Sequence, residues 1–151
     1  PGGWIELLEQ DPQHCCDDGT MPADSFLAKN HKLMVDSGNN ASRPLTMIYD
    51  MQRMVEETGF VNVHKIDYKF PIGEWPKLQV YKDAGRVALN QMKNGMEGWI
   101  LWLLTMYGSP KPWSVEEVQV YLAKVRDDIN NRKYHAYSSV RRIWARKPLN
   151  A

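Results

Sequence analysis

Cysteine is scarce in this chain, and its two cysteines, Cys15 and Cys16, are adjacent. Neighbouring cysteines rarely bridge each other and no spaced pairs exist, so a disulfide-stapled secreted fold is not expected. The run His14-Cys15-Cys16-Asp17 cannot easily wrap one tetrahedral ion, and no second ligand pair stands at zinc-site spacing. No histidine or asparagine is arranged for a cysteine nucleophile either. We therefore expect no metal site and no cysteine protease.

Long apolar runs and a charge excess are also lacking. The most apolar stretch, Trp99 to Leu104, is far shorter than the roughly 20 residues that a spanning helix needs, so no membrane partner is expected. The formal net charge of +1 gives no general argument for nucleic acid. A basic run near the end of the chain is more simply a strand with exposed charges. The cysteine usage favours an intracellular setting, in the cytoplasm or the nucleus.

A Gly-x-Gly-x-Gly stretch is absent as well. Gly2-Gly3 precedes an apolar stretch, whereas a cofactor-binding glycine turn follows its strand and opens a helix. We therefore expect no cofactor-binding residues in this chain. The chain opens on Pro1-Gly2-Gly3 without an initiator Met, and such a turn normally follows the end of a helix. This opening predicts the back part of a larger domain.

Alternating patterns along the chain predict an α/β layered fold. We expect strands over residues 4–8, 61–70 and 134–146, and helices over residues 26–38, 46–59, 77–93, 96–107 and 115–129, with Thr46 as the N-cap of the second helix. No linker or repeat divides the chain, so one domain is expected. Three strands alone would make a thin sheet, which again indicates that front strands are absent.

Three local signals are sharper than the rest. Gly59 predicts a left-handed helix end that packs Phe60 back onto the helix. The apolar phase of the strand over residues 61–70 changes near His64, which predicts a bulge. Ser114 and Glu117 form a capping box, in which each side chain satisfies the other residue's free amide. Together they fix where two helices and one strand begin or end.

Several stretches of the chain, in this order, resemble the back half of class I S-adenosylmethionine-dependent methyltransferases, and more narrowly the fungal LaeA-like methyltransferases. The matching stretches are Pro1-Gly2-Gly3, Trp4-Ile5-Glu6-Leu7, Asp17-Asp18-Gly19-Thr20, Arg43-Pro44-Leu45-Thr46, Val55-Glu56-Glu57-Thr58-Gly59-Phe60, Phe70-Pro71-Ile72-Gly73-Glu74-Trp75-Pro76 and Arg146-Lys147-Pro148. The resemblance spans almost the whole chain.

This resemblance implies a fold and a division of labour. The three expected strands would be the fifth, sixth and seventh of a Rossmann-like sheet, with the last one antiparallel between the other two. Residues 1–151 would be the C-terminal portion of a single methyltransferase domain. Residues 11–44 and 75–132 would be insertions over the substrate side. The S-adenosylmethionine site would lie in the absent front half, so this chain alone is expected to be inactive.

Candidate site residues follow the first strand. Ligands of open α/β sheets lie beyond the carboxyl ends of the strands, which places Glu9, Gln10, Asp11 and His14 near the reacting centre. His14 is a candidate base for methyl transfer, although a solvated loop histidine is the simpler interpretation. Trp99 and Trp102 either line an apolar substrate pocket or fill the core.

Two functions from different classes remain open. The resemblance implies a fragment of a methyltransferase that acts on a small molecule, most plausibly a secondary metabolite. It also allows a regulator of secondary metabolism that keeps the methyltransferase fold and works through protein partners. A third possibility is a truncated gene product without activity.

Overall fold

The computed structural model describes residues 1–150, which form three strands and four α-helices. In chain order the elements are β1 (Trp4–Cys15), α1 (Phe26–Asn40), the short 3₁₀ helix η1 (Met47–Tyr49), α2 (Met51–Glu57), β2 (Val61–Pro71), α3 (Gln79–Tyr107), α4 (Val115–Asn130) and β3 (Tyr137–Arg146). The chain is therefore an α/β fold.

The three strands form one sheet in the order β1-β3-β2. The last strand, β3, lies in the middle and runs antiparallel to both neighbours, as the resemblance implies. The bulge expected near His64 is confirmed, because Val61 pairs with Arg146 and His64 already pairs with Trp144. Asn62, inside this bulge, takes a positive φ of 52°.

The first and last strands have other bounds than the sequence predicts. β1 continues to Cys15 rather than ending near Leu8, because a second bulge carries it across the polar residues. Gln10 pairs with Val140 and His14 with Ser138, so β1 has two more residues between these pairs than β3 has. β3 begins at Tyr137 rather than Tyr134, whose amide closes a turn instead.

The two helices expected over residues 77–93 and 96–107 are a single helix, α3. The prediction was wrong because Gly95 does not end the helix. Met96, Ile100, Leu103 and Leu104 are buried at helical spacing beyond it, and packing this face outweighs the weak helix propensity of one glycine. Within residues 1–150, no helix is both long and apolar enough to cross a bilayer.

Helix ends were predicted with mixed success. Thr46 does not cap α2: it precedes η1, and α2 starts only at Met51. The Schellman end is confirmed, since Gly59 has φ 90° and the Phe60 amide donates to the Val55 carbonyl at 3.3 Å. The capping box of α4 is also confirmed by reciprocal side-chain bonds between its Ser114 N-cap and Glu117.

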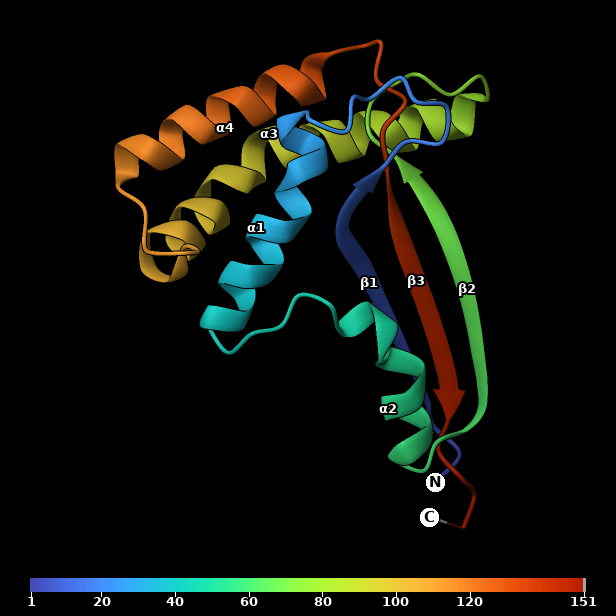
Figure 1. The fold of residues 1–151 in the computed structure, drawn as a ribbon. Helices are drawn as coiled ribbons and strands as arrows, with labels where there is room; N and C mark the ends of the chain where they lie inside the picture. Colours follow the sequence, from blue (N-terminus) through green and yellow to red (C-terminus); the bar gives the residue numbers. More distant parts are fainter. Residues whose placement is uncertain (151) are drawn as a thin grey trace.

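The helices divide the sheet into two regions (Figure 1). α1, α3 and α4 gather where β1 and β2 end, and they enclose the larger core, which includes Leu27, Met34, Leu104 and Leu122. α2 packs near the other end of the sheet, where Met51 and Val55 meet Ile143 and Ala145 in a smaller core. The first region positions the candidate site.

A close backbone contact anchors α3 beside the end of β2. The Gly73 amide donates to the Gly85 carbonyl at 3.0 Å, and Gly73 itself has φ 92°. A Cβ added to Gly85 would lie 1.9 Å from the Gly73 carbonyl oxygen. Only glycine fits at position 85 without moving the helix, because no real Cβ approaches an oxygen so closely.

We expect Gly85→Ala to lower the free energy of unfolding by about 2 kcal/mol or more, since it overpacks a rigid backbone contact. The matched control is Gly98→Ala on the same helix, where an added Cβ would meet nothing within 4 Å. That change should raise stability by roughly 0.5–1 kcal/mol, because alanine is the better helix former. Chemical denaturation measures both, and equal stability of the two variants would contradict the contact.

Candidate functional site

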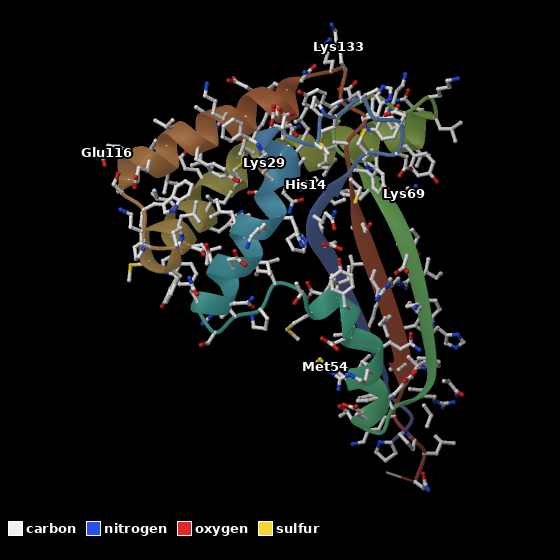
Figure 2. All side chains as sticks on the ribbon, viewed as in Figure 1. His14, Lys29, Met54, Lys69, Glu116 and Lys133 are labelled. Atoms are coloured by element: carbon white, nitrogen blue, oxygen red, sulfur yellow. The ribbon has the colours of Figure 1, made fainter. Side chains whose placement is uncertain are left out.

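A cavity of about 420 Å³ lies between the end of β1 and helices α1 and α3. Figure 2 shows His14 in this region, between β1 and α1. Its polar wall is formed by Glu9, Gln10, Asp11, His14, Asn30, Gln91 and Ser138. A cavity of this size accommodates a small organic ligand.

The bulge in β1 builds the polar wall. The Gln13 amide donates to the Asp11 carboxylate at 2.9 Å, which closes the bulge as an Asx turn. This turn brings His14 opposite Ser138 of β3. Ser138 Oγ then accepts a hydrogen bond from Gln10 Nε2 at 3.0 Å and lies 3.0 Å from His14 Nδ1. Two side chains on either side of the bulge thus meet one buried hydroxyl.

Asp11 is held by a second partner from outside the sheet. The Tyr49 hydroxyl of η1 donates a hydrogen bond to the Asp11 carboxylate. This bond stabilises the protonated phenol beside a negative charge and raises the pKa of Tyr49 to about 12. Asp11 is itself buried, although it is a charged residue. Its two oxygens are occupied by the protein, one by Tyr49 and one by the Gln13 amide.

His14 is a buried, neutral imidazole. Burial lowers its pKa to about 4, since the charged form loses its hydration; nearby Asp11 opposes this shift and His31 adds to it. Within residues 1–150, three side-chain nitrogen or oxygen atoms are buried without a hydrogen-bond partner, and they are His31 Nδ1, Ser37 Oγ and Arg142 Nε. His14 Nε2 is not one of these atoms, so it is not buried without a partner. The geometry leaves Nε2 available to a group in the cavity.

The apolar wall comes from three helices and the end of β2. The stretch before η1 and η1 itself also contribute. The apolar lining residues include Met34, Leu45, Met47, Phe70, Ile72, Ala88, Met92, Met96, Trp99, Ile100 and Val125. Asn30 interrupts this wall, and it accepts a hydrogen bond from the buried Tyr121 hydroxyl of α4. The cavity is therefore polar on its β1 side and mostly apolar on its helical side.

The structure brings together most of the predicted site residues. Glu9, Gln10, Asp11, His14 and Trp99 line the cavity, and Trp102 does not. A shift of three positions turns a side chain about 60° around the helix axis and moves it along by about 4.5 Å, so Trp102 faces elsewhere. Its ring instead packs edge to face on Tyr107.

Sequence reasoning missed Ser138, Tyr49 and Asn30. Ser138 lies 124 positions from His14, and only the register of β1 on β3 joins them. No local pattern could have found that contact. Tyr49 follows the Arg43-Pro44-Leu45-Thr46 stretch, but its contact with Asp11 depends on the turn into η1.

The start of α1 is poorly suited to anchor S-adenosylmethionine. Two backbone amides at the start of α1, the helix that follows β1, already donate hydrogen bonds within the protein. The Leu27 amide donates to the Asp128 carboxylate at 2.9 Å, and the Ala28 amide donates to the Ser25 hydroxyl oxygen at 3.1 Å. These two amides at the start of the helix are therefore not free to bind a cofactor. Residues 1–150 also contain no group of three or more side chains placed to hold a metal ion.

The depressed pKa of His14 predicts a pH dependence of stability. His14 titrates near 6.5 in the unfolded chain and near 4 in the folded one, so the unfolded chain binds more protons between these values. The free energy of unfolding should therefore fall as pH drops from about 7 to 4, and His14→Gln should remove that part of the fall. An NMR titration of the His14 ring reports its pKa directly, and a value near 6.5 would contradict the burial.

Comparisons with known proteins add the family. No protein-family model matches the chain. It is 32% identical to "Methyltransferase pytC" of Aspergillus terreus over 98% of the chain and 45% of that protein. It is 32% identical to "Secondary metabolism regulator LAE1" of Cochliobolus heterostrophus, over 98% of the chain and 48% of the relative. It is 27% identical to "Probable methyltransferase tdiE" of Emericella nidulans, over 98% of the chain and 46% of that relative.

The chain spans about half the length of the curated relatives that it matches. The shared names include both methyltransferases and regulators of secondary metabolism. A C-terminal fragment of such a protein fits these matches. Over nearly its whole length, this chain is thus similar to proteins that are named as methyltransferases and as LaeA-type regulators of secondary metabolism.

Proposed function

We propose that the full-length protein that includes this chain is an S-adenosylmethionine-dependent methyltransferase acting on a small molecule, most plausibly a secondary metabolite. In this proposal the chain supplies the acceptor side of the enzyme. The observation that carries it is the cavity on the Gln10-His14-Ser138 network, found in a chain whose relatives are named methyltransferases.

His14 is the residue we propose to handle the acceptor's proton. Ser138 Oγ has two lone pairs, so it can accept from both Gln10 and the Nδ1–H of His14. That tautomer leaves the Nε2 lone pair free toward the cavity. An acceptor hydroxyl or amine placed there would pass its proton to the neutral imidazole as the methyl group arrives, because burial weakens this base and disfavours proton transfer beforehand.

Other parts of the enzyme follow from the same proposal. The methyl donor, S-adenosylmethionine, is held by residues outside this chain, in the front strands of a Rossmann-like sheet. Residues 11–44 and 75–132 act as insertions that close over the acceptor, and they contribute most of the lining. Free Cys15 and Cys16 are compatible with the cytoplasm or the nucleus as the working compartment.

A regulatory role is the second candidate. The relative from Cochliobolus heterostrophus is named a secondary metabolism regulator and is as similar to this chain as the named methyltransferase is. A regulator of this kind would keep the fold and act through protein partners. The two candidates differ in one measurable respect, which is whether a small molecule gains a methyl group.

The test uses the full-length product of the gene that encodes this chain. We expect it to bind S-adenosylmethionine by calorimetry and to transfer an isotopically labelled methyl group to a small molecule in an extract of its own organism. Trp99→Ala should raise KM for that molecule by about 10-fold, because the side chain lines the cavity. His14→Gln should lower kcat by 10²-fold or more, as expected for a lost base.

Trp102→Ala is the matched control for the tryptophan variant. Both residues lie on α3 and both are nearly half exposed, at 46% and 47%, but only Trp99 lines the cavity. The control should leave KM unchanged. Cofactor binding without any labelled small molecule would favour the regulatory role, and no cofactor binding at all would overturn the enzyme proposal.

A further inference from the structure

The charges around the cavity are of one sign. Of the described residues that line it, none is Lys or Arg, and two, Glu9 and Asp11, are carboxylates. His14 adds no positive charge, since it is buried as the neutral imidazole. An anionic ligand in this cavity would meet two carboxylates without a compensating cation, which is strongly unfavourable in a partly enclosed site.

Arg141, a cation that acts on Asp11, is already engaged by other groups. Arg141 lies close enough to Asp11 to interact with its charge. Its Nε and one terminal nitrogen bind the Asp67 carboxylate at 2.7 and 3.0 Å, and its other terminal nitrogen binds the Ile48 carbonyl at 2.9 Å. A ligand carboxylate could recruit Arg141 only by breaking this set of bonds. Glu9, in contrast, is exposed at the cavity and forms no ion pair within residues 1–150.

The apolar side of the cavity suits a flat ring. Met34, Met92 and Met96 contribute flexible thioethers, which pack favourably against aromatic edges. Trp99 contributes a broad planar surface at the rim, where it is 46% exposed. Together these side chains form a surface that gains most from a polarisable planar ligand.

Gly95 leaves the room for such a ring. It lines the cavity on α3, and a Cβ added there would meet nothing within 4 Å. A larger side chain at this position would enter the empty space without striking the protein. Gly98, one turn along the same helix, has equally open surroundings but does not line the cavity.

From these observations we propose that the cavity takes an uncharged or positively charged aromatic molecule, with its polar group on the Gln10-His14-Ser138 side, and that it excludes anionic ones. This inference rests on the proposed function in that it describes the methyl acceptor of that enzyme. It names a substrate class by charge and shape, and both follow from the lining.

The test measures binding rather than turnover, on the full-length gene product. Three two-ring probes of similar size differ in charge: 2-naphthol is neutral, N-methylquinolinium is cationic and 2-naphthoate is anionic. Ligand-observed NMR gives each Kd. We expect 2-naphthoate to bind at least about 10-fold more weakly than the other two. Glu9→Gln should reduce that difference, because it removes the exposed carboxylate at the cavity.

A pair of glycine variants locates the binding. Gly95→Leu should weaken binding of 2-naphthol by about 10-fold, because it fills the cavity. Gly98→Leu should leave it unchanged. Thermal unfolding checks that both variants fold as well as the parent protein, which the open surroundings of both glycines lead us to expect.

The outcomes separate this inference from the enzyme proposal. Selective binding without methyl transfer would support the ligand class and count against the enzyme. Methyl transfer to an anionic acceptor would support the enzyme and overturn the ligand class. Equal binding of all three probes, no binding of any, or no effect of Gly95→Leu would also overturn it.

Discussion

The pairing of β3 with two strands at once is the constraint on which the rest of the structure depends. β1 and β2 do not pair with each other, and each is hydrogen-bonded only to β3 in the described sheet. The central strand is the last one in sequence, so the sheet forms by long-range pairing. Its side chains are buried accordingly, with Ile143 and Ala145 inaccessible. The two helical regions pack on a sheet that this one strand joins.

The polar side of the cavity depends on the pairing of β1 with β3. Ser138 on the central strand meets two side chains of β1, and the bulge in β1 aims His14 at the helices. Most of the apolar wall is supplied separately, by α1, α3 and α4, with Phe70 added from the end of β2. One side is therefore set by strand register and the other by helix packing. Burial keeps His14 neutral between a hydroxyl and an apolar wall, and the role proposed for it is to accept a proton only as methyl transfer proceeds.

Local signals in the sequence predicted local structure well. The Schellman end at Gly59 and the capping box at Ser114 depend only on neighbouring residues, and both are confirmed. The sequence predicted two separate helices over residues 77–93 and 96–107, but the buried residues beyond Gly95 keep them in one helix. A general rule on strand ends gathered Glu9 to His14 as candidates, although β1 continues past them to Cys15, so they lie within the strand and not beyond its end. Ser138, in contrast, required knowledge of register. Trp99 and Trp102 point in different directions from α3, and only Trp99 lines the cavity. Their spacing in the sequence does not reveal which of the two faces it.

The contact between Gly73 and Gly85 fixes the position of α3 near its start. The helix is held against backbone near its start. Trp99 lies 14 residues beyond Gly85, which is about 21 Å along the helix axis. A tilt of about 3° at Gly85 would displace Trp99 by about 1 Å, a shift large enough to change how a ring fits. A change at the contact between Gly73 and Gly85 would therefore shift one wall of the cavity, although neither glycine lines it. A substitution at position 73 is thus expected to alter the shape of the cavity while every lining residue stays the same.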